Sequence, residues 1–280
     1  MLGKLMKHEF RATGRIMLPV MAAMVLLALL ANLSIRGLTS GLSEIPYLRF
    51  VFILIVVFFG VGIVATGVMA IVIMVSRFYR NLLKDEGYLM FTLPVTVHEH
   101  IWSKLIVSLV WFLVAALVIF LVMSLTALNL ASTNLEMIIQ SFPSWAEIRE
   151  FLEESGIFGP LVRIFLQGIL MTVIGTLVCC LHFYAAMALG HMFTKDKILL
   201  SIVFYVGISF LFNLMNVGYG SVMSITLNDS MELNEAIQAA STMLDMMSKV
   251  FWYAIVIEVI QGAVLYLATA LGLKRGLNLG

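Results

Sequence analysis

Charged and polar side chains inside long hydrophobic runs are the first residues of this sequence that could do chemistry. Glu258 stands in the run 251–273, nearer its start than its end. A charge at the centre of a bilayer costs about 2.5 to 3.5 kcal/mol on insertion scales, so this carboxyl group must face protein or water, or be protonated. We expect Glu258 to be either a substrate-contacting or gating carboxylate or a hydrogen-bonded packing partner. The packing partners within reach of a folded chain would be Gln261, Asn213 or His182.

His182 and Asn213 are the other candidates for a path through the membrane. They stand in the hydrophobic runs 164–190 and 198–217. Polar side chains in membrane helices often join one helix to another by hydrogen bonds rather than bind cargo. Both interpretations therefore stay open for these two residues.

A metal site is not expected in this chain. The segment His98-Glu99-His100 contains two metal-ligand residue types, but residues two apart point to different sides of a helix. The H-E-x-x-H zinc spacing also fails, because Trp102 stands where the second histidine would be.

Residues with small or soft side chains predict packing rather than chemistry. Cys179 and Cys180 are adjacent in mid-run, so they offer neither a disulfide framework nor a spaced zinc motif. Small residues also recur four positions apart, a spacing that favours close contact between membrane helices. The pairs are Ala186 with Gly190 and Ala268 with Gly272.

The elements that must position these residues are membrane-spanning helices. Of the 280 residues, 62% are hydrophobic and only 12% are charged, and the mean hydropathy is +1.06. A span needs about 20 apolar residues, because each adds about 1.5 Å toward a core of about 30 Å. The sequence therefore predicts an all-α polytopic membrane protein with six spans, at about 16–33, 50–76, 105–130, 164–190, 198–217 and 251–273.

The distribution of Lys and Arg predicts the orientation of these spans. The net charge is only +1, which gives no support to a nucleic-acid partner. Basic residues are retained on the cytoplasmic side of a membrane. We therefore expect both termini inside the cell, since 12 of the 17 Lys and Arg then lie on the inner side: Lys4, Lys7, Arg11, Arg15, Arg77, Arg80, Lys84, Lys104, Lys195, Lys197, Lys274 and Arg275.

The segments outside the spans have helical periodicity of their own. Residues 1–15 separate an apolar face from a basic face, which predicts an amphipathic helix lying on the inner leaflet or a basic topology flank; the rest of the chain, 16–280, is then the transmembrane domain. The outer segments 131–163 and 218–250 predict acidic amphipathic helices. These are either solvated connections or a cap over an exit path.

The cytoplasmic loop 77–104 is the most informative stretch. A basic run is followed by Asp85-Glu86-Gly87, then by an apolar segment that ends at Leu93-Pro94. This order predicts a short amphipathic helix exposed to the cytosol. Exposed apolar side chains at such a place favour a protein partner, although a solvated connector is the alternative.

At these residues the chain resembles the type 2 ATP-binding cassette (ABC) exporter permeases, in particular the stand-alone permease subunits of Gram-positive bacteria. The matching residues are Glu86, Gly87, Leu93, Pro94 and Lys104, and the amphipathic N-terminus and six-span layout agree. The chain departs from the family pattern at Tyr88, where a threonine is frequent. The resemblance covers most of the chain, but only this loop is motif-specific.

The resemblance implies a transport subunit, not an enzyme, in a bacterial plasma membrane. A separate ABC ATPase would supply ATP and Mg²⁺, because this sequence contains no G-x-x-x-x-G-K-[ST] phosphate loop. A second permease, identical or related, would complete the path. Family members move peptides, drugs, lipids or cell-wall precursors by alternating access. The coupling residues would be Asp85, Glu86, Gly87, Tyr88, Leu89, Phe91, Leu93 and Pro94.

Two other classes of function compete with the exporter permease. A stand-alone secondary transporter or channel would use intramembrane ionisable groups such as Glu258 and His182. An intramembrane enzyme would need a concentrated set of catalytic residues, whereas the spans offer scattered single ones.

Overall fold

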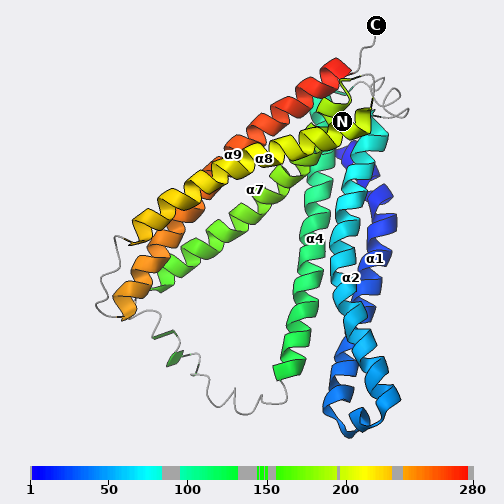
Figure 1. The fold of residues 1–280 in the computed structure, drawn as a ribbon, viewed down its shortest axis with the longest axis vertical. Helices are drawn as coiled ribbons and strands as arrows, with labels where there is room; N and C mark the ends of the chain where they lie inside the picture. Colours follow the sequence, from blue (N-terminus) through cyan, green and yellow to red (C-terminus); the bar gives the residue numbers. More distant parts are fainter. Residues whose placement is uncertain are drawn as a thin grey trace. The chain divides into compact units, whose positions relative to one another are not determined.

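The chain is built from long α-helices. The computed structural model describes residues 2–83, 95–131, 144, 146–147, 149–150, 156–193, 196–228 and 236–276, with side chains except at 130–131, 217–228, 236–240 and 275–276. No strand occurs in these ranges, which confirms the all-α prediction. The long helices are α1 (Leu2–Thr39), α2 (Pro46–Phe78), α4 (Val97–Ala131), α7 (Phe158–Gly190), α8 (Lys197–Asn228) and α9 (Ala236–Gly276) (Figure 1).

Each of these six helices is long and apolar enough to cross a membrane. Their exposed side chains are largely Leu, Val, Ile and Phe, as expected for surfaces that face lipid. Hydroxyl groups within the helices bond to the carbonyl four residues earlier, as Thr66 does to Gly62 and Thr172 to Gly168. The chain is a multi-pass membrane protein, as the sequence predicted.

The helix boundaries differ from the prediction in two places. Residues 2–15 are helical, but they form the first turns of α1 rather than a separate helix, because neither Gly14 nor Pro19 interrupts it. In the expected outer segment 218–250, α8 continues to Asn228 and α9 begins at Ala236. Both helices therefore extend beyond the apolar runs 198–217 and 251–273. Of the other outer segment, residues 132–143, 145, 148 and 151–155 are not described.

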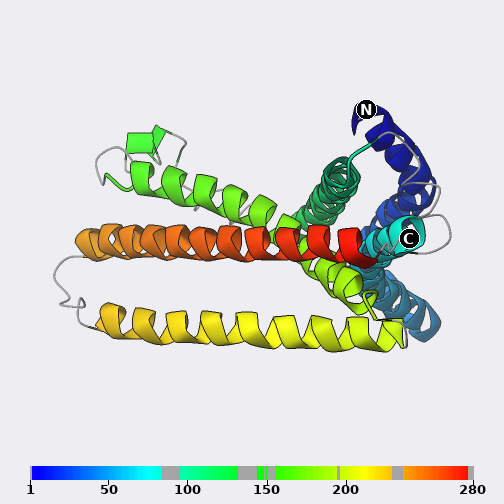
Figure 2. The ribbon, with the colours of Figure 1, turned by 90° about the horizontal axis from the view of Figure 1, so that it is seen from above.

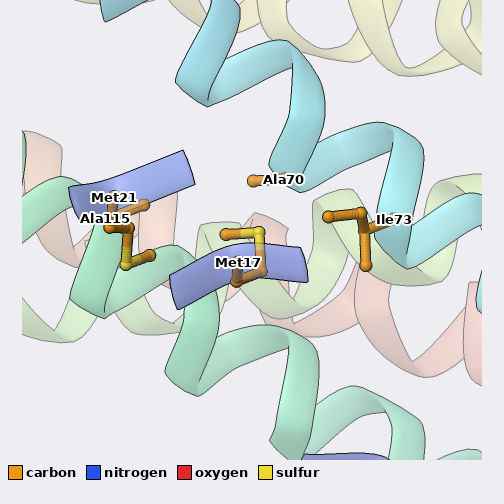
Figure 3. Close-up of a cluster of buried hydrophobic side chains, with 5 residues drawn as sticks. All are labelled: Met17, Met21, Ala70, Ile73 and Ala115. Atoms are coloured by element: carbon orange, nitrogen blue, oxygen red, sulfur yellow. The ribbon is translucent and has the colours of Figure 1, made fainter. Parts of the chain in front are cut away.

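The first of two compact units comprises Met1–Phe78 and Glu99–Phe142. Buried residues of α1 recur at every third or fourth position, the spacing of one helical face. This face packs against α2 and α4 in the cluster that Figure 3 shows, where two methionine side chains lie among small and branched residues. Its members are Met17, Met21, Ala70, Ile73 and Ala115.

The second unit comprises Tyr79–His98 and Pro143–Gly280, and its helix α7 contacts both α8 and α9. The three helices run beside one another in both views (Figure 1; Figure 2). A Cβ atom on Gly190 would lie 2.6 Å from the backbone nitrogen of Ser201, and one on Gly272 would lie 3.0 Å from Ala188 Cβ. The predicted close packing at these two glycines is confirmed.

Candidate functional site

The predicted coupling residues lie in a loop whose flanks alone are described. Asp85, Glu86, Gly87, Tyr88, Leu89, Phe91, Leu93 and Pro94 all fall outside the described part of the chain. The flanks on either side, residues 77–83 and 95–104, are described with their side chains. Their contacts show which helices adjoin each end of the loop.

Both flanks of the loop are joined to the same turn of α1. Lys104 Nζ lies 2.6 Å from Glu9 Oε1, and the two side chains are only 3% and 10% exposed. On the other flank, Arg77 donates a hydrogen bond from Nη2 to the carbonyl oxygen of Ala12 at 3.0 Å. We call Glu9, Ala12, Arg77 and Lys104 the loop-flank cluster. The cluster holds the end of α2 and the start of α4 on one helix.

Further contacts continue the cluster along α1 and α4. The Thr13 hydroxyl donates to the Glu9 carbonyl oxygen at 2.7 Å and accepts a hydrogen bond from Trp111 Nε1 at 2.8 Å. A Cβ atom on Gly14 would lie 3.3 Å from the Trp111 ring, so glycine lets the indole lie against α1. The pairs 9 with 104 and 13 with 111 advance in the same direction, so α1 and α4 are parallel.

Tyr79 and His98 are closer in sequence to residues 84–94 than Arg77 and Lys104 are, and they contact residues of the second unit. Tyr79 begins a π-helical turn, Tyr79–Leu83, and its ring meets the His191 ring edge-on with centroids 5.3 Å apart. Single π-helical turns are common at functional sites. On the other side, His98 Nδ1 lies 2.6 Å from Tyr266 Oη of α9. No described His, Cys, Asp or Glu side chains form a group of three that could hold a metal ion.

His191 directly follows the last residue of α7. Its Nδ1 atom lies 2.9 Å from the carbonyl oxygen of Met187. Burial lowers the pKa of His191 from its ordinary value of 6.5, and the nearby positive charge of Lys197 lowers it further, while the contact with Met187 acts in the opposite direction. The fold therefore favours the neutral imidazole beside Tyr79.

Glu258 lies partly buried on α9, beside α7. It is near the middle of the membrane-compatible part of α9, Ser241–Lys274, and its Oε1 atom would lie 3.3 Å from a Cβ atom on Gly175 of α7. Its buried Oε2 atom has no hydrogen-bond partner among the described residues, and neither has Nε2 of Gln261 one turn further along. Glycine at position 175 leaves space for a carboxyl group that the surrounding helices do not satisfy.

His182 and Asn213 have environments unlike that of Glu258. His182 Nε2 lies 3.2 Å from the Tyr205 carbonyl oxygen and 3.1 Å from Ser209 Oγ, both on α8. His182 thus joins α7 to α8, two turns or about 10 Å along α7 from Gly175. Asn213 is exposed on α8. The structure describes no hydrogen bond that links Glu258, His182 and Asn213 to one another.

Sequence reasoning missed Glu9 and Thr13. Glu9 is the only acidic residue in the basic segment 1–15. It also falls on the apolar side, at the helical spacing Leu2, Leu5, Glu9 and Thr13. An acidic residue on the apolar face of a basic helix was the available signal for a buried cation partner.

Comparison of the chain with protein-family models, with curated proteins and with solved structures gave no match in any of the three.

Proposed function

We propose that the chain is the transmembrane subunit of an ABC exporter. Six apolar helices suggest a membrane transport protein, and the proposal adds a separate cytoplasmic ABC ATPase that binds ATP and Mg²⁺. Residues 84–94 would dock on this ATPase from the inner side of a plasma membrane, with both termini on the same side. A second permease, identical or related, would complete the translocation path.

One observation supports this proposal above the others. Arg77 and Lys104 fix the outer flanks of the loop to α1, while Tyr79 contacts His191 at the end of α7 and His98 contacts Tyr266 of α9. A displacement of residues 84–94 would therefore act on helices of both units. Alternating access needs such a connection, because rigid helices must change their arrangement together when the ATPase closes.

Single-cysteine crosslinking tests the position and partner of the loop. In a Cys179→Ala, Cys180→Ala background, we expect Tyr88→Cys to crosslink to a subunit that photolabels with an ATP analogue. Tyr47→Cys is the matched control, because Tyr47 is exposed at the opposite end of α2. Labelling of Tyr88→Cys by an impermeant maleimide in intact cells, or crosslinking to no nucleotide-binding subunit, would overturn the proposal.

A paired substitution tests whether the loop-flank cluster transmits the signal. Glu9→Gln with Lys104→Met removes both charges of the ion pair together. We expect this double variant to assemble with the ATPase but to lose the effect of the permease on ATP turnover. Arg163→Gln with Asp245→Asn, an exposed pair 3.2 Å apart, should leave turnover unchanged. Equal turnover in all three proteins would refute transmission through the cluster.

Glu258 favours a second candidate function, a stand-alone secondary transporter or channel. Its unsatisfied carboxyl group near the middle of α9 fits an ion or proton pathway. In that case, vesicles containing the purified chain without any ATPase would dissipate an imposed pH gradient. Glu258→Gln would abolish the flux. If vesicles with the wild-type chain kept the imposed pH gradient, a proton pathway of this kind would be excluded.

A further inference from the structure

A groove lies between α1 and α4 at the end of the first unit away from the loop-flank cluster. Its volume is about 480 Å³, within the range of about 300 to 1,000 Å³ that is usual for ligand sites. Leu29 and Leu33 of α1 and Leu125 and Leu128 of α4 form its apolar walls. The walls are therefore suited to hydrocarbon.

The end of the groove that contains Arg36 is polar, and hydrogen bonds between α1 and α4 stabilise it. Arg36 donates from Nε to Asn129 Oδ1 at 2.7 Å, and Asn129 donates from Nδ2 to the Asn32 carbonyl oxygen at 2.8 Å. Asn32 in turn donates from Nδ2 to Thr126 Oγ1 at 3.2 Å. These bonds fix the Arg36 side chain over the groove through its Nε atom.

The positive charge of Arg36 is not neutralised within the described part of the chain. No described carboxylate forms an ion pair with it, and its two terminal nitrogens donate no hydrogen bond there. Guanidinium groups favour phosphate oxygens, which accept two parallel hydrogen bonds. Because Arg36 is exposed and only its Nε atom is bonded, its two Nη atoms can bind an anion.

The order of these residues matches the order of groups in a phospholipid. Along α1 the leucines precede Arg36, and along parallel α4 Leu125 precedes Asn129, so the apolar walls lie deeper in the span than the charge. We propose that the groove binds an anionic phospholipid, with its phosphate at Arg36 and an acyl chain along the leucines. By the predicted orientation this lipid belongs to the outer leaflet. A zwitterionic lipid fits less well, because its ammonium group would repel the guanidinium. The proposal does not depend on an ATPase partner.

Native mass spectrometry of the purified full-length chain tests this site. Dioleoyl phosphatidylglycerol and dioleoyl phosphatidylethanolamine are the probes, because they share acyl chains and differ in net charge. We expect the wild-type chain to prefer the glycerol lipid about tenfold, the effect of one charge-assisted contact. Arg36→Gln should remove this preference, and Arg36→Lys should keep most of it. Arg49→Gln, which removes an exposed charge from the start of α2, is the matched control and should change nothing.

A second pair of variants tests the apolar walls and does not disturb the polar end. Leu33 is 65% exposed at the groove, so Leu33→Trp should fold and should block it. Leu30→Trp, at an exposed position of α1 that does not line the groove, is its control. We expect Leu33→Trp to weaken binding of the glycerol lipid about tenfold, and Leu30→Trp to bind like the wild type.

Several results would overturn the proposal. Equal binding of the two lipids, or equal loss in Arg36→Gln and Arg49→Gln, would show that no specific anion site exists at Arg36. Unchanged binding in Leu33→Trp would remove the lipid from the groove, even if Arg36→Gln failed to fold. Displacement of the lipid by glycerol 3-phosphate at equal concentration would assign Arg36 to a free phosphate compound instead.

Discussion

Lys104→Met would remove the cation from the buried ion pair of the loop-flank cluster. The charged atoms are 2.6 Å apart, so Coulomb's law gives about 6 kcal/mol of attraction at an effective dielectric constant of about 20. Desolvation of both charges offsets much of this attraction. Loss of one partner from a buried pair typically lowers the free energy of unfolding by about 3 to 5 kcal/mol, and we expect this loss for Lys104→Met.

The double variant Glu9→Gln, Lys104→Met should recover most of this loss, because it removes both charges of the pair together. The coupling energy between the two positions should then reach at least about 2 kcal/mol. The exposed pair Arg163 and Asp245 is the control, with both side chains more than half exposed. Its coupling energy should not exceed about 1 kcal/mol.

Unfolding by sodium dodecyl sulfate in mixed micelles provides the assay. In a background in which Trp102, Trp145 and Trp252 are replaced by Phe, the fluorescence of Trp111 reports on the contact between α1 and α4, because its indole bonds to Thr13 beside the ion pair. The two single variants and the double variant complete a double-mutant cycle. If the single losses simply add in the double variant, Glu9 and Lys104 do not stabilise each other and the argument from burial is wrong.

Two further predictions use the same unfolding assay. Gly190→Ala should lower the free energy of unfolding by about 1 to 3 kcal/mol, because its Cβ atom would lie 2.6 Å from the Ser201 backbone nitrogen. The control Gly207→Ala meets no atom within 4 Å and should be neutral or slightly stabilising. Equal effects of the two substitutions would contradict the close approach of α7 and α8. The pKa of His191 in the folded chain is below its ordinary value of 6.5. At a pH between the folded-state pKa and 6.5, the unfolded chain therefore binds more protons than the folded chain. The stabilising contribution of His191 should be complete above that window and be lost as the pH falls through it, and a stability profile of His191→Gln with the same slope as the wild type would count against this burial.

The number and type of the helices could be predicted from the sequence because the bilayer imposes a simple length rule. A run of about 20 apolar residues must form its backbone hydrogen bonds internally, so it becomes a helix wherever it occurs. The ends of the helices were less predictable. Residues 2–15 and 236–250 have helical periodicity and no interruption, so they extend α1 and α9 beyond the apolar runs.

The sequence alone also determined which residues could carry chemistry, since a charged residue in an apolar run is visible without a fold. Only the tertiary structure decided their partners. Glu9 and Lys104 are 95 positions apart, and their contact depends on the parallel register and rotation of α1 and α4. In the same way, Glu258 lies beside Gly175, where its Oε2 atom has no hydrogen-bond partner among the described residues. His182 instead has hydrogen-bond partners on α8. Hydrophobicity along a chain fixes where helices lie, but it does not fix the face that each helix turns toward its neighbours.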